Sequence, residues 1–133
     1  MPKSINYKAK LDRVFSEYTR LRDSDENGMI RCYCCGKVLY WKESQNMHFI
    51  PRQHMGTRFD EVNCHAGCIK CNYYSNGNIE AYIIHLKKDF GSDIVERLSL
   101  KKQIGRKISE FEYKELIKYY QNEVKRLKQE KGL

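Results

Sequence analysis

The sequence predicts a small α+β fold in which a cysteine-rich core of short strands is flanked by helices at both ends. All six cysteines gather in the middle of the chain, where short runs of β-forming residues also lie. The segments on either side show the three- and four-residue apolar spacing of amphipathic helices. A chain of 133 residues has the size of one domain, which we divide into an N-terminal helix (7–23), a core (29–78) and C-terminal helices (79–131).

Four of the cysteines predict a closed metal site. They form two C-x-x-C pairs: Cys32 with Cys35, and Cys68 with Cys71. Each pair makes a tight turn whose two thiolates point at one centre, and tetrahedral Zn²⁺ accepts two such pairs. Four thiolates leave no position for water, so the zinc is expected to be structural. Because residues 36–67 separate the pairs, a sizeable insert must fold between them.

Disulfide bonds are the alternative for six cysteines in a small chain. Residues 1–6 are polar and no long apolar run follows, so we expect neither a secretory signal nor a membrane span. Thiolate-bound metal in a reducing cytoplasm is therefore favoured. Cys34 and Cys64 are left over. Pairings within Cys32-x-Cys34 or Cys64-x-x-x-Cys68 are conceivable, although the two-residue spacing fits a metal-binding turn better.

The N-terminal segment, residues 7–23, is predicted to form an amphipathic helix. Its apolar residues recur at three and four: Leu11, Val14, Phe15, Tyr18 and Leu21. The polar run over residues 23–28 ends the helix, because such residues prefer turns. Packing against the metal-binding core is its default role.

Short strands are expected around the first cysteine pair. They cover residues 29–31, 38–41 and 47–50. Residues 42–46 form a polar turn, and Pro51 ends the last strand because it has no N–H for a ladder. Residues 51–67 show no periodicity, so we expect a long polar loop, which in a compact domain is usually functional.

From Ile69 the pattern becomes helical. A short helix is expected to end near residues 75–77, and longer helices follow. Their predicted boundaries are caps and breaks at Asn78, Gly91, Ser92, Gly105 and Ser109. The last helix should run to about Lys128, and its apolar stripe is too short to indicate a sustained coiled coil.

The charge of the chain favours a nucleic-acid partner. Its 25 Lys and Arg against 17 Asp and Glu give a net charge of +8, and ten tyrosines lie among the cations. A basic surface rich in aromatic side chains suits phosphates and bases. A domain with a lysine-rich surface and no nucleic-acid partner would have the same composition. The sequence motifs must therefore distinguish between these two interpretations.

The insert between the cysteine pairs carries such a motif. His48 lies on a predicted strand, Asn63 in the loop, and Asn72 directly after Cys71. This combination resembles the HNH (His-Me finger) endonucleases. The chain is more similar still to the NinG (Rap) family of phage recombination proteins, over about residues 31–78. The residues that carry the likeness are Cys32, Cys35-Gly36-Lys37, Trp41, His48-Phe49-Ile50, Arg52, His54, Thr57-Arg58-Phe59-Asp60-Glu61, Asn63, Cys68, Cys71-Asn72 and Gly77-Asn78.

The resemblance implies a zinc-stabilised ββα-metal core and metal-dependent endonucleolytic cleavage of DNA. The substrate would be branched or single-stranded recombination intermediates. His48 would be the general base, and Asn72 would hold a catalytic Mg²⁺ or Mn²⁺. Asn63 would hydrogen-bond the strand or loop so that His48 stays aimed. Three residues would contact DNA: Arg52, His54 and Arg58.

Met47 departs from the family pattern. Many relatives carry Asp or His at this position as a second metal ligand, whereas a thioether binds Mg²⁺ poorly. The catalytic metal is therefore expected to have few protein ligands, none of them charged, and weak activity is one consequence. The alternative is a non-catalytic, zinc-stabilised DNA-binding module that assists recombination. The resemblance also implies a phage or prophage product in the bacterial cytoplasm, acting as a monomer or homodimer.

Overall fold

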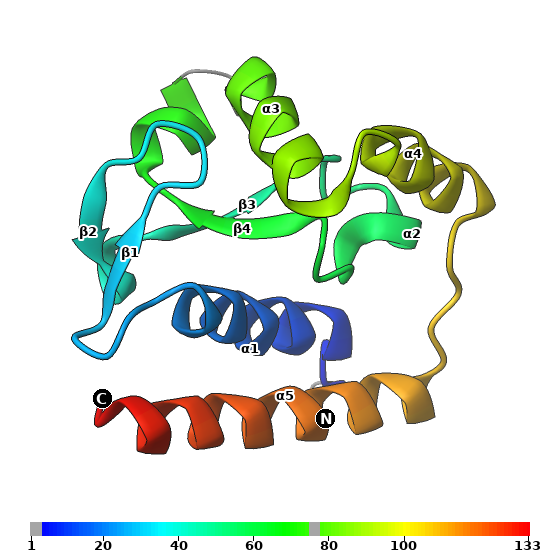
Figure 1. Ribbon diagram of the computed structural model, residues 1–133. Coiled ribbons are helices and arrows are strands. Elements are labelled where there is room, and N and C mark those ends of the chain that lie inside the picture. The colour runs from blue at the N-terminus through cyan, green and yellow to red at the C-terminus, as the bar shows by residue number, and fades with distance from the viewer. Residues whose placement is uncertain (1–3, 75–77) are drawn as a thin grey trace.

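The computed structural model describes residues 4–74 and 78–133. It consists of helices and two small sheets (Figure 1). The elements in chain order are α1 (Tyr7–Arg22), β1 (Met29–Arg31), β2 (Val38–Tyr40), the 3₁₀ turn η1 (Trp41–Glu43), β3 (Gln45–His48), α2 (Met55–Arg58), β4 (Cys64–Gly67), the π-helical turn η2 (Lys70–Tyr74), α3 (Ile79–Phe90), α4 (Ile94–Ile104) and α5 (Glu110–Lys131). The predicted mixed α+β class is confirmed.

The strands form two antiparallel pairs. In the first sheet Met29 faces Tyr40 and Arg31 faces Val38. In the second sheet β3 pairs with β4, so that His48 lies opposite Cys64. The predicted strand over residues 47–50 is shifted, because β3 begins at Gln45, inside the expected turn, and ends at His48.

The prediction of an irregular loop over residues 51–67 is wrong in two places. Met55–Arg58 forms α2, a single turn that is too short to show a helical period. Cys64–Gly67 forms β4, and all four of its residues are buried. A strand that is covered on both faces lacks the polar–apolar alternation that marks strands in a sequence.

Side-chain caps mark the starts of α1 and α5. The Asn6 side chain accepts a hydrogen bond from the Ala9 N–H at 3.0 Å at the start of α1. Ser109 caps α5 as predicted, because its Oγ accepts from the Glu112 N–H at 3.1 Å. That helix continues to Lys131, beyond the expected end.

Two predicted caps differ in the structure. Asp93, rather than Ser92, precedes α4. Asn78 does precede α3, but its side chain makes no capping bond there and instead donates to Cys71 Sγ at 3.5 Å. The predicted end of the short helix near residues 75–77 lies outside the described part of the chain.

The β3–β4 sheet lies between two helical layers. Helix α1 packs on one side of it, with α5 on the outer side of α1, and α3 and α4 lie on the other side of the sheet (Figure 1). The α1 side holds one apolar cluster, with Phe15 and Cys64 among its members, and the α3 side holds a second, with Met47 and Tyr82. Since successive strand residues point to opposite faces, His48 lies on the α1 side.

No helix of the described residues is both long and apolar enough for a membrane crossing.

Candidate functional site

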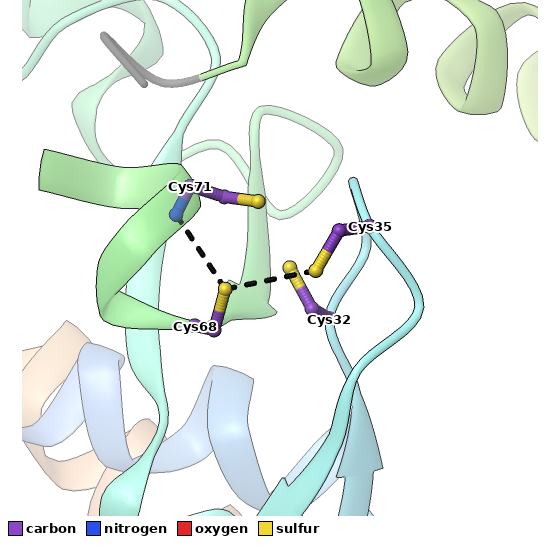
Figure 2. A group of neighbouring side chains, drawn as sticks. All are labelled: Cys32, Cys35, Cys68 and Cys71. Carbon is purple, nitrogen blue, oxygen red and sulfur yellow. Dashed lines mark hydrogen bonds between the residues drawn. The ribbon is translucent and has the colours of Figure 1, made fainter. Parts of the chain in front are cut away.

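Four cysteines come together as predicted. Their sulfur atoms lie within 4.8 Å of one another and point toward a common centre (Figure 2). The Sγ atoms of Cys35 and Cys68 are 3.7 Å apart. Tetrahedral Zn²⁺ with bonds of about 2.3 Å requires sulfur–sulfur distances of about 3.8 Å. The cluster can therefore hold a structural metal such as zinc.

Local backbone geometry shapes the two cysteine turns. Gly36 has a φ of +80°, which suits glycine, and its N–H donates to the Cys32 carbonyl at 2.9 Å. In the second turn the Cys71 N–H donates to Cys68 Sγ at 3.5 Å. Burial acts to raise the pKa of the Cys68 thiol, but hydrogen bonds from the neighbouring groups outweigh burial and lower that pKa, whereas burial raises the pKa of Cys35 and Cys71. Without a metal, Cys68 is therefore the most acidic of these three thiols.

The remaining two cysteines stand outside this cluster. No disulfide bond joins any of the six cysteines, so neither of the conceivable disulfide pairings is present. Burial raises the pKa of Cys34 to about 12, and it also raises the pKa of Cys64, which lies in β4. Both thiols are therefore poor candidates for reactive groups.

A separate cleft of about 510 Å³ runs along β3. Residues of α1, β3, η2 and the start of α3 line it. Three residues singled out from the sequence meet in this cleft: His48, Arg52 and Asn72. Strand, loop and helical turn thus bring an imidazole, an exposed guanidinium and a carboxamide to one place.

The hydrogen bond of His48 shows which of its two ring nitrogens carries the proton. Its Nε2 lies 2.9 Å from the carbonyl oxygen of Arg58, and a carbonyl can only accept, so Nε2 carries the proton. Nδ1 is left with a lone pair and bonds to none of the described residues. Burial lowers the pKa of His48, and the charges of Arg52 and Arg58 lower it further. The imidazole is therefore neutral near pH 7.

Asn63 lies behind the cleft, fully buried. Its Oδ1 accepts from the Ile50 N–H at 2.8 Å, and its Nδ2 donates to the carbonyls of Ile50 at 3.0 Å and Thr57 at 3.1 Å. These bonds fasten the segment after β3 to α2. Asn63 thus contacts the segment next to His48, as its predicted role requires.

Unlike Arg52, the residues Arg58 and His54 do not line the cleft. The guanidinium of Arg58 is bound inside the protein, to the Asp12 carboxylate and to the Arg52 carbonyl. His54 precedes α2 and is not among the residues that line the cleft. Of the three predicted DNA contacts, only the Arg52 side chain is both exposed and at the cleft.

Met47 and Asn46 lie on opposite faces of β3. Met47 is 1% exposed and points into the cluster on the α3 side, against Gly67. Asn46 lines the cleft, and its Oδ1 is buried without a hydrogen bond to the described residues. An unpaired buried acceptor costs about 1–3 kcal/mol, so a partner for this oxygen is expected.

The sequence patterns did not identify two polar residues that line the cleft, Asn46 and Asp12. Asn46 lies two positions before His48, so the two-residue period of a strand would have placed both on one face. Asp12 carries no such signal, because it is one of several charged residues on the polar face of α1.

His65, whose role the sequence left open, lies on the α3 side of the sheet. Its ring stacks on Tyr33 with centroids 3.8 Å apart, and Nδ1 is 3.2 Å from the Tyr82 hydroxyl. Burial lowers its pKa to about 4. It is a neutral, packed histidine remote from the His48 face.

Comparison with known proteins gives a consistent family. A family model described as "Bacteriophage Lambda NinG protein" matches residues 2–130. Two curated relatives, both named "Protein ninG", come from Escherichia phage 933W and Enterobacteria phage VT2-Sa. Each is 26% identical over 86 residues, which cover 65% of this chain and 41% of the relative. The match thus spans less than half of the relatives' length. No solved structure matches.

Proposed function

Because this chain belongs to the NinG family, we propose that it is a metal-dependent DNA endonuclease of the HNH type that acts in phage or prophage recombination. One observation carries the proposal. His48, whose Nδ1 is unprotonated, lines a cleft that also contains Asn72 and the exposed Arg52. A base, an oxygen ligand and a phosphate-binding cation are the groups that phosphodiester hydrolysis needs.

In the proposed reaction His48 is the general base. Nδ1 takes a proton from water, and the hydroxide oxygen attacks the scissile phosphorus. The bond from phosphorus to the 3′ oxygen then breaks, the 3′ oxygen takes a proton from solvent water, and the imidazole returns its proton to solvent. As the imidazole becomes positive, the Nε2–H bond to the Arg58 carbonyl becomes charge-assisted and stabilises it. Arg52 binds a phosphate oxygen and orients the substrate.

The cleft contains donors that fit a hard divalent cation. Asn72 and Asn46 offer neutral amide oxygens, and the unpaired Oδ1 of Asn46 is the observation that favours a bound partner. Mg²⁺ accepts few protein ligands because it keeps several of its waters. Bound there, Mg²⁺ or Mn²⁺ would stabilise charge on the phosphate and on the leaving oxygen.

At the cysteine cluster we assign the metal as Zn²⁺, in a structural role. Four sulfur ligands favour zinc over Mg²⁺ or Ca²⁺ and leave no coordination position for water. The zinc would fix the turn between β1 and β2 against the start of η2, and η2 carries Asn72. Its contribution to cleavage would therefore be indirect.

The substrate class follows from the family and from charge. A net charge of +8 favours DNA, and the recombination setting favours branched or single-stranded intermediates in the bacterial host cell. Both a monomer and a homodimer are compatible with this function.

A non-catalytic DNA-binding module is the second candidate. Among the described residues that line the cleft, Asp12 is the one carboxylate, and Arg58 already binds it. A cation site with only neutral protein ligands binds weakly. This module would bind DNA without cleaving it.

The test is nicking of supercoiled plasmid and of a four-way junction, with Mg²⁺ or Mn²⁺, by wild type, His48→Ala and His54→Ala. Loss of the base should slow cleavage about 10²- to 10⁴-fold, whereas His54→Ala, outside the cleft, should retain the His48-dependent chemistry. DNA binding, which should weaken as salt rises, should survive in both variants. Binding without cleavage in either metal would favour the non-catalytic module.

A further inference from the structure

Arg58 connects three segments that meet at the cleft. From the end of α2, its Nε donates to Asp12 Oδ1 of α1 at 3.0 Å, and Nη2 binds the other carboxylate oxygen. Nη1 donates to the Arg52 carbonyl at 3.0 Å. The carboxylate and guanidinium are only 17% and 14% exposed, so this two-point ion pair is shielded from water and geometrically defined.

The same residue holds the imidazole through its backbone. As the last residue of a single helical turn, Arg58 has a carbonyl with no partner inside α2. That carbonyl accepts the Nε2–H of His48. Any shift of the Arg58 backbone therefore moves the group that selects the tautomer of His48. A carbonyl that withdrew would let the proton occupy either nitrogen.

We infer that Asp12 and Arg58 form a positioning pair, which anchors α2 to α1 and thereby keeps the His48 imidazole oriented with Nδ1 unprotonated toward the cleft. This inference rests on the proposed function, in which Nδ1 is the base. It gives α1 a role beyond packing. Neither Asp12 nor Arg58 needs to touch the reacting atoms.

The deciding measurement is made on the imidazole itself. In zinc-loaded, ¹⁵N-labelled protein, the nitrogen chemical shifts of His48 report its tautomer without any substrate. Asp12→Asn should convert a single Nε2–H tautomer into a mixture. Glu17→Gln is the matched control. It also removes an α1 carboxylate from an ion pair, with Lys128 at 2.9 Å, but Glu17 does not line the cleft.

Kinetics provide a second readout. Misplacement of a catalytic group by about 1 Å can cost about a hundredfold, so Asp12→Asn should lower kcat by ten- to a hundredfold. The KM for DNA should change by less than about threefold, because Arg52 still binds phosphate. Glu17→Gln should leave kcat and the His48 tautomer at wild-type values.

The outcomes separate this inference from the proposed function. A His48 tautomer that is unchanged in folded Asp12→Asn would overturn the positioning role, whether or not the protein cleaves DNA. An altered tautomer supports positioning, and if wild type fails to cleave, only the endonuclease proposal is lost. Should Asp12→Asn fail to fold, Arg58→Lys, which keeps the charge but loses the two-point geometry, gives the same test.

Discussion

Gly56 of α2 packs against the backbone carbonyl of Lys101 in α4 so closely that a Cβ on Gly56 would lie 1.9 Å from the carbonyl oxygen. The obstacle is backbone, so it cannot rotate away as a side chain would. This contact fixes α2 from the α4 side, while the ion pair between Arg58 and Asp12 fixes it from the α1 side. The turn that orients His48 is therefore held between two helices.

A methyl group at this contact should disturb stability and the cleft together. Gly56→Ala should lower the free energy of unfolding by about 1–3 kcal/mol through overpacking, and slow nicking by moving the Arg58 carbonyl. Urea unfolding and the plasmid assay measure the two effects. Lys102→Ala, an exposed change in α4, is the control. Wild-type stability in Gly56→Ala would show that α2 is not tightly packed there.

The zinc assignment predicts that the cysteines are not equivalent. Cys68→Ser should abolish bound zinc and sharply lower the melting temperature, because structural zinc contributes several kcal/mol or more to folding. Cys34→Ser should keep one zinc per chain, since its sulfur stands outside the four-sulfur cluster. Elemental analysis and calorimetry of the purified variants measure both. Equal zinc loss in the two variants would contradict the proposed ligand set.

His65 should make the fold sensitive to acid. Burial holds its pKa near 4 in the folded state, against about 6.5 in the unfolded chain. Between these values the unfolded state binds more protons, so stability falls as the pH drops through this window, by up to roughly 3 kcal/mol. Urea midpoints of wild type and His65→Phe, compared at several pH values, measure this contribution.

The phenyl ring keeps the stacking on Tyr33 but cannot be protonated, so His65→Phe should lose less stability in acid than wild type. Both proteins carry the same metal-binding cysteines, so acid release of metal affects them alike. If the stability of the two proteins falls in parallel as the pH drops, His65 is not the source of the acid sensitivity.

Local signals accounted for what the sequence predicted well. Each cysteine turn is contained within four residues, and its chemistry fixes its geometry. The apolar stripe of α1 and the Ser109 cap of α5 are likewise signals within short stretches of sequence. Both helices were therefore predicted to within a few residues at their ends. The candidate base, His48, was found because a motif marks it.

What was missed depends on tertiary contacts. Strand β4 is buried on both faces, so nothing in its four residues alternates. The partnership of Asp12 with Arg58 joins residues far apart in the chain, and neither residue type indicates the other. The side of the sheet on which Met47 lies is fixed by tertiary structure, because Met47 pairs with His65 across β3 and β4 and packs on the α3 side.

That placement reverses the expectation for a carboxylate at position 47. From the sequence, Met47→Asp would supply the ligand that many relatives have. The Met47 side chain is instead buried against Gly67 on the α3 side. A carboxylate there would be desolvated without a partner, so we expect a loss of several kcal/mol in stability and no gain in metal affinity.

Asn46→Asp should have the opposite effect, because position 46 lines the cleft with Asn72. A charged oxygen in place of the neutral amide should tighten Mn²⁺ binding by tenfold or more, and lower the metal concentration for half-maximal nicking. Mn²⁺ titration followed by electron paramagnetic resonance measures affinity directly, without DNA. Asn46→Ala is the matched loss-of-ligand variant and should weaken binding. If Mn²⁺ binds equally well to wild type, Asn46→Asp and Asn46→Ala, the unpaired oxygen of Asn46 serves a bound water rather than a cation.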